Sequence, residues 1–166
     1  VVERPEALAK VNGEAIFTDD LQFPGMLYGA TLRAGIPHAL VKDINIDRAK
    51  QFDGVRAVLT AADVPGRLNH GLVIHDWPAL IGVGHKVRYV GDAVAIGAAD
   101  SQAIAQQALD LIEVDFEQLP VVADPVAALD PDAPQVHEQG NLLKHIKVDK
   151  GDIVLGFEQA EVIFEE

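Results

Sequence analysis

Apolar and polar positions are patterned most clearly between Lys86 and Pro125. Around the Gly91-Asp92 pair, strand-prone apolar residues predict extended chain: Val87, Tyr89, Val94 and Ile96. Asp100 or Ser101 can cap a helix, and after them apolar residues recur at helical spacing: Ile104, Ala105, Ala108, Leu109 and Ile112. Residues 113–117 then alternate polar and apolar, as in a strand with one wet face. The segment therefore predicts a strand, a helix and a second strand.

A similar unit is predicted nearer the N-terminus. Its expected elements are strands over 26–32 and 39–46 joined through a turn at 34–37, a short helix capped by Asp47 and ended by Asp53-Gly54, and a strand over 55–60. Later in the chain, Asp124-Pro125 and Asp152 each begin a short helix, and 161–166 reads as a last strand. This alternation favours an α+β domain with a mixed sheet and packed helices over a doubly wound sheet.

The stretch between Asp63 and Asp92 has five glycines, two prolines and only scattered apolar residues. Such a long excursion within a domain is either a decorated loop with short strands or an interaction surface. Trp77, beside Asp76 and Pro78, is the kind of residue that anchors one protein surface in another. We therefore expect Trp77 and Tyr89 to make interdomain contacts.

Composition limits what the chain can do. Its 166 residues suit one domain over 1–166, and the net charge of −13 opposes binding to nucleic acid or anionic lipid. With no cysteine, the chain has no thiol nucleophile and no thiolate for an iron–sulfur cluster. No apolar run is long enough for a membrane helix and the first residues lack a signal peptide, so a cytoplasmic location is expected. The apolar final segment suggests a fragment of a longer protein.

Several motifs in order resemble the α/β-hammerhead domain of the molybdenum-binding subunit in the xanthine dehydrogenase and aldehyde oxidase family. They cover nearly the whole chain: Asn12-Gly13-Glu14-Ala15, Thr18-Asp19-Asp20, Pro37-His38-Ala39, residues 54–63 (GVRAVLTAAD), residues 88–92 (RYVGD), residues 113–120 (EVDFEQLP), Ala133-Pro134 and Val136-His137.

The resemblance implies a parent oxidoreductase, a molybdenum hydroxylase that hydroxylates purines, other N-heterocycles or aldehydes with water as the oxygen source. The parent would carry molybdopterin, iron–sulfur clusters and FAD. The family's cofactor-binding and catalytic motifs follow this region and are absent here, so we expect no cofactor, no metal and no catalytic residue in the fragment. Its partners would be the molybdopterin-binding region and the iron–sulfur domain or subunit. Residues at the lip of the substrate funnel would be His137, Asn141 and Leu142.

Other chemistries find little support in the residues. His70, His75 and His85 share the long excursion, but their spacing matches no compact metal site, so solvated or interface histidines are expected. Gly82-Val83-Gly84 lacks the context of a phosphate-binding loop. Gly91-Asp92 is better explained as a turn or bulge between strands, in which glycine permits a positive φ and Asp92 bonds to nearby amides. Ser101, the one serine, is best used as a helix cap. The alternative to an enzyme fragment is a stand-alone hammerhead-type binding or carrier module, although no lysine has the setting of a carrier site.

Overall fold

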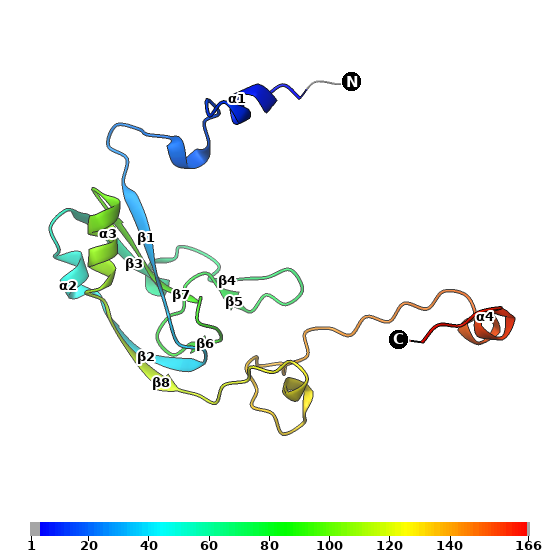
Figure 1. Cartoon of the computed structure of the whole chain (residues 1–166). Helices are drawn as coiled ribbons and strands as arrows, with labels where there is room; N and C mark the ends of the chain where they lie inside the picture. The colour runs from blue at the N-terminus through cyan, green and yellow to red at the C-terminus, as the bar shows by residue number, and fades with distance from the viewer. Residues whose placement is uncertain (1–3, 166) are drawn as a thin grey trace. The chain divides into compact units, whose positions relative to one another are not determined.

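The computed structural model describes residues 4–165, and the chain divides into two compact units, of which the first ends at Val121 and the second begins at Val122. The first unit contains nearly all the regular structure (Figure 1). Its helices are α1 (Ala7–Val11), η1 (Thr18–Asp20), α2 (Asp47–Lys50), η2 (Ala61–Asp63) and α3 (Gln102–Leu109). Its strands are β1 (Tyr28–Arg33), β2 (Ala39–Asn45), β3 (Val55–Thr60), β4 (Asn69–His70), β5 (Trp77–Pro78), β6 (Lys86–Val87), β7 (Ala93–Ala99) and β8 (Glu113–Gln118).

The strands form three small antiparallel sheets, which confirms the α+β prediction. β7 is central in the order β1-β7-β3, β2 is central in the order β6-β2-β8, and β4 pairs with β5. The predicted neighbours β1 and β2 are both strands, but they lie in different sheets. The turn between them carries the chain from one sheet to the other.

Two strand-helix-strand units cross between the larger sheets in opposite directions. The unit β2-α2-β3 leaves one sheet and enters the other, and β7-α3-β8 returns. Because β3 pairs with β7 and β2 pairs with β8, each sheet joins one strand from each unit. Each of the two larger sheets therefore needs a strand from both strand-helix-strand units.

Small side chains let α3 lie close against the β1-β7-β3 sheet (Figure 1). Ala105 and Ala108 are fully buried, and the Ser101 hydroxyl accepts a hydrogen bond from the Ile104 amide at 3.3 Å, as predicted for a helix cap. A side chain at Gly97 would lie 3.4 Å from the Leu109 Cδ2 atom, so β7 passes directly beneath the helix. Ile112 is buried as expected, but it follows the end of α3 and is not part of the helix face.

The interior has two clusters of buried residues. The larger lies between the β1-β7-β3 sheet and the helices, and the smaller gathers Ala39, Val41, Ile81 and Val87 around β2. Ile44 and Val114 pack against both clusters. These two side chains link the interiors of the two sheets.

A buried histidine fixes the chain where it leaves β8. His38 is 4% exposed, its backbone carbonyl accepts from the Leu119 amide at 3.1 Å, and its Nδ1 lies 2.6 Å from the Pro120 carbonyl oxygen. Because a carbonyl only accepts, Nδ1 must carry the proton. The His38 Nε2 atom is buried without a hydrogen-bond partner among the described residues.

The start of α3 is also held by an exposed ion pair. The Arg56 Nε and Nη2 atoms donate to the two Asp100 carboxylate oxygens at 2.7 and 2.6 Å. The hydrogen bonds from Arg56 lower the pKa of Asp100, and those to Asp100 raise the pKa of Arg56. This pair ties β3 to the residue that precedes the Ser101 cap.

The second unit has little regular structure: η3 (Ala127–Leu129) and α4 (Ile153–Gln159). The Asp152 carboxylate accepts from the Leu155 amide, so the helix start predicted there is confirmed. The Asp124 carboxylate accepts from the amides of Val126 and Ala127, but Pro125 lies in a turn and the helix, a 3-10 helix, begins only at Ala127. The strand predicted over 161–166 is wrong for the described residues 161–165, because the structure gives it no partner strand. That 1–166 forms a single domain stays a prediction.

Candidate functional site

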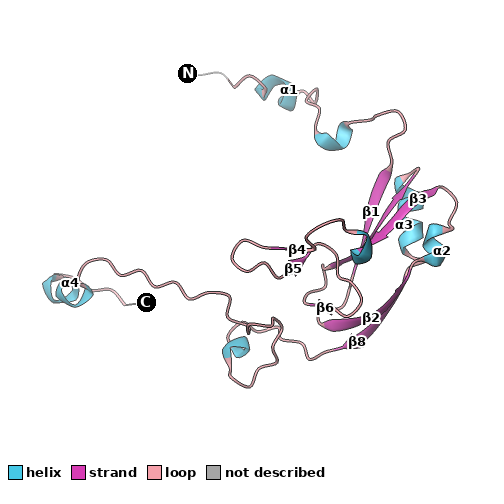
Figure 2. Cartoon of the chain, turned by 180° about the vertical axis from the view of Figure 1, so that it is seen from behind, coloured by secondary structure: helices cyan, strands magenta, loops and turns pink. Residues whose placement is uncertain are grey.

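The excursion between Asp63 and Asp92 contains a two-stranded hairpin. Its registers are Asn69 with Pro78 and His70 with Trp77, and the Ala79 amide donates to the Leu68 carbonyl at 2.8 Å. The tip requires glycine at 71, since φ is +154° and an added Cβ would collide with the Ile74 carbonyl oxygen. Figure 2 shows that most of the surrounding excursion is loop. The excursion thus has the short strands of the decorated-loop alternative, and its role as an interaction surface stays a prediction.

Three aromatic side chains meet on this hairpin. The Trp77 ring stacks on His70 with centroids 6.0 Å apart and planes 16° from parallel. The Tyr89 ring meets Trp77 edge-on, at 5.9 Å and 89°. Trp77 is 51% exposed and Tyr89 44% exposed, so the cluster presents a large apolar surface to solvent. The two residues expected to make interdomain contacts therefore lie together.

Polar contacts hold this aromatic cluster in place. Arg88 Nη1 donates to the Asp76 carbonyl oxygen at 2.5 Å and lies 3.3 Å from its carboxylate. The Asp92 side chain, 3% exposed as a residue, accepts from the amides of Arg88 and Tyr89 at 2.7 and 3.4 Å. Asp76, which precedes Trp77, and Arg88, which precedes Tyr89, are thus tied to one another.

The Gly91-Asp92 turn corrects part of the sequence interpretation. Asp92 bonds to nearby amides as predicted, but Gly91 does not take a positive φ. Glycine is needed there for space, because the Tyr89 ring covers the position and would collide with a Cβ. The Gly91 carbonyl also accepts from Arg33 Nη1 at 2.8 Å, so the turn is joined to the end of β1.

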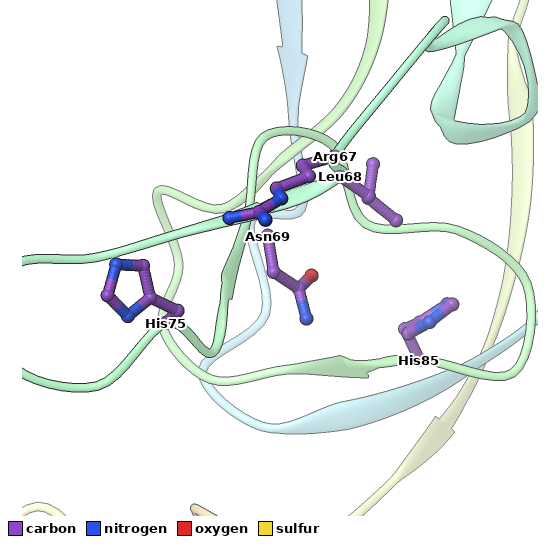
Figure 3. Close-up of a pocket in the computed structure, with 5 residues that line it drawn as sticks. All are labelled: Arg67, Leu68, Asn69, His75 and His85. Carbon is purple, nitrogen blue, oxygen red and sulfur yellow. The ribbon is translucent and has the colours of Figure 1, made fainter.

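A surface hollow of about 430 Å³ opens beside the hairpin (Figure 3). Arg67, Leu68, Asn69, His75 and His85 line it. In Figure 3 Asn69 lies between the two histidines, and the Arg67 guanidinium lies above Asn69. Arg67 and the two histidines are exposed, so these polar groups face water.

The residues predicted for the funnel lip belong to the second unit, and they behave differently from one another. The Asn141 side-chain oxygen Oδ1 accepts from the Val136 backbone amide at 2.9 Å, and its Nδ2 atom donates to the backbone carbonyls of Ala128 and Pro134 at 3.0 and 3.1 Å. It therefore holds the segment together. His137 is half-buried and Leu142 is 58% exposed, which leaves Leu142 available for contact.

The described residues do not fit a molybdopterin or a bound metal. Within 4–165 no three histidine or acidic side chains gather as metal ligands. The amides at the 88–92 turn could attract an anionic cofactor group, but the Asp92 carboxylate already takes them. Among the residues that line the hollow, Arg67 is the single arginine. We assign no step of a molybdenum reaction to these residues.

Reasoning from the sequence missed His38 and the organising role of Asn141. Both act through backbone carbonyls supplied by residues that only the fold brings near. His38 lies in the Pro-His-Ala motif, which points to this position but does not predict its hydrogen bond to Pro120. The Arg67–His75–His85 hollow also depends on hairpin pairing, which no residue spacing reveals.

Comparison with known proteins decides the family. Residues 12–120 match the family described as aldehyde oxidase and xanthine dehydrogenase, a/b hammerhead domain. The chain belongs to this hammerhead family. The predicted resemblance and the hammerhead fold are thereby confirmed.

The relatives of this hammerhead domain are subunits of molybdenum enzymes. A probable xanthine dehydrogenase subunit of Bacillus subtilis is 44% identical over 98% of the chain, which spans 22% of that protein. The nicotinate dehydrogenase large molybdopterin subunit of Eubacterium barkeri is 36% identical over 97% of the chain, which spans 37% of it. The chain thus covers between about a fifth and two fifths of these two relatives.

Solved structures agree with this fold. The aldehyde oxidoreductase of Desulfovibrio desulfuricans gives a TM-score of 0.78 at 32% identity, over 96% of this chain and 19% of that one. The quinoline 2-oxidoreductase of Pseudomonas putida gives 0.75 at 34% identity, over 86% and 19%. Within residues 4–165 no helix is both long and apolar enough to cross a bilayer.

Proposed function

We propose that this chain is the hammerhead domain of a molybdenum hydroxylase, and that it acts as a structural and interdomain element. The observation that carries the proposal is the match to relatives about four to five times its length, over nearly all of this chain. The parent would be a cytoplasmic oxidoreductase that hydroxylates purines, N-heterocycles or aldehydes with water as the oxygen source. Its molybdopterin, iron–sulfur clusters and FAD would be bound by polypeptide outside these residues.

The proposed contact with the rest of the enzyme is the aromatic cluster of His70, Trp77 and Tyr89. Large aromatic side chains dominate the energetics of protein interfaces, and a preordered surface loses little entropy on binding. Trp77 and Tyr89 are both close to half exposed, while Arg88 and Asp92 fix the backbone beside them. In the same proposal His137 and Leu142 reach the substrate funnel, with Asn141 setting the shape of their segment.

The test of the parent enzyme compares two preparations. Affinity purification of the native protein from its source cells should recover a polypeptide longer than 166 residues with stoichiometric molybdenum by elemental analysis. The 166-residue chain expressed alone should contain neither molybdenum nor iron, because it has no thiolate for a cluster. A native protein of this length without molybdenum would sink the proposal and favour a stand-alone module.

The contact surface has its own test, because Trp77 is the sole tryptophan. In the isolated chain its fluorescence should be red-shifted and readily quenched by iodide. In the longer polypeptide the same emission should be blue-shifted and protected. Free N-acetyltryptophanamide gives the upper limit of quenching. Equal quenching in the two proteins would remove Trp77 from the interface and leave the parent-enzyme proposal standing.

A further inference from the structure

The excursion over residues 64–91 differs from the rest of the chain in charge. It holds three basic residues, Arg67, Lys86 and Arg88, against one acidic residue, Asp76, which gives +2 in a chain of net charge −13. The other residues therefore carry −15. Three of the six histidines also lie in the excursion. The small positive charge of the excursion should raise the local concentration of anions, which the rest of this acidic protein repels.

The side chains that line the hollow beside the hairpin include hydrogen-bond donors with no acceptor among the described residues. The side chains of Arg67, Asn69, His75 and His85 make no hydrogen bond or ion pair anywhere in residues 4–165. This contrasts with Arg88 nearby, which is held by Asp76. An arginine fork, a carboxamide and two imidazoles, each with an N–H in either charge state, are donors suited to an oxygen-rich anion.

The hollow's shape limits the ligand. It is an open surface hollow of about 430 Å³ rather than an enclosed pocket, so it suits a small ligand held at the surface, and Leu68 adds an apolar wall. The hairpin ladder and the Ala79-to-Leu68 hydrogen bond hold Leu68 and Asn69 in position. The donors on this part of the surface are therefore partly preordered.

We propose that this hollow is a binding site for a small oxyanion, a phosphate- or carboxylate-bearing molecule, with Arg67 as its principal charge partner. In Figure 3 Asn69 lies between His75 and His85, so in this proposal the two imidazoles would turn toward the anion from either side of Asn69. The site is distinct from the aromatic contact surface and from molybdenum chemistry. It does not depend on the proposed function.

The test is an NMR titration of the full 166-residue chain with inorganic phosphate and with benzoate, each against sodium chloride at equal ionic strength and constant pH. Saturable shifts should appear at residues 67–70, 75 and 85 and at the Arg67 side chain, with a dissociation constant on the order of millimolar. Saturation by benzoate alone assigns a carboxylate ligand, and saturation by phosphate alone assigns a phosphate. Either outcome supports the site.

Matched variants separate this site from general attraction of anions. Arg67→Gln should weaken binding roughly tenfold, the loss expected for one charge-assisted hydrogen bond. Arg48→Gln makes the same charge change at an exposed pair with Glu113 and should leave binding unchanged. Asn69→Asp, which places a carboxylate in the hollow, should abolish it. Unsaturable shifts spread over all basic residues, or equal binding by Arg67→Gln in a chain with an otherwise unchanged spectrum, would overturn the inference.

Discussion

The interface between α3 and β7 and the excursion over 64–91 are ordered by different means. Against β7 the helix buries alanines, and Ala95, Ala99, Ala105 and Ala108 are all fully buried. The excursion buries few side chains and depends on particular polar contacts, Asp92 with two amides and Arg88 with Asp76. Because the first region is closely packed, it should tolerate charged substitutions on its surface. It should lose stability when a larger or a polar side chain is placed in its interior. The excursion should lose its structure only locally when a single polar contact is removed.

The largest expected effect comes from a charge in the packed region. Ile112→Asp should lower the free energy of unfolding by roughly 3–5 kcal/mol, because a carboxylate would be buried without a partner. Gln106→Glu, on the exposed face of α3, should change it little. Urea unfolding of both variants measures the difference, and equal stability would contradict the burial of Ile112.

Removing the central contact of the excursion should cost less. Asp92→Ala leaves the amides of Arg88 and Tyr89 without their acceptor, and should cost about 1–3 kcal/mol. The exposed Asp115→Ala serves as the control. Hydrogen exchange should quicken around residues 86–92 and stay slow in β7. Faster exchange throughout the unit would mean that the two regions unfold together.

The hairpin tip gives a still more local change. Gly71→Ala should displace the turn, since the added methyl group collides with the Ile74 carbonyl oxygen, and should separate the Trp77 and His70 rings. Gly66→Ala, where nothing lies near the added Cβ, is the matched control. Trp77 fluorescence should change in the first variant alone while the urea midpoint of both stays near that of the parent chain.

The smallest effect is electrostatic and lies beside the packed region. Because the folded state lowers the pKa of Asp100, that group contributes stability above its unfolded pKa and loses it as pH falls through the folded value. Asp100→Asn should therefore flatten the acid limb of the stability curve, without changing the Ser101 cap. Asp110→Asn is the control. Identical acid limbs for the wild type and Asp100→Asn would show that the Arg56 pair adds nothing in solution.

Local patterns predict the packed region better than the excursion. Ser101, the apolar spacing of α3 and the alternation of β8 are readable because each depends on neighbours within a few residues. The prediction for Ile112 is wrong in one respect, because helical spacing continues past the point where the chain turns into β8. The positive φ predicted for Gly91 is also wrong, since sequence does not show that a nearby ring fills the space beside it.

Partners distant in sequence account for the remaining differences. Whether β1 and β2 share a sheet is decided by their pairing with β7 and β8, whose paired residues follow them by 60 or more positions. The hollow and the Asn141 contacts arise in the same way, since their members come from separate segments. The order of the family motifs identifies the hammerhead fold even so, but it does not predict the geometry of the site.

The reciprocal crossing of β2-α2-β3 and β7-α3-β8 has a consequence for biosynthesis. Tyr28 pairs with Ala99, and Ala39 pairs with Gln118. The β1-β7 and β2-β8 ladders can therefore form only after these distant residues have been synthesised. Such long loops close slowly. A chain emerging from the ribosome exposes β1 and β3 without partners until β7 appears, and β2 has only the two-residue β6 as a partner until β8 appears. The nascent domain therefore acquires its two larger sheets late and almost together. Slow synthesis or a pause before residue 93 prolongs the period in which chaperones must protect these unpaired strands.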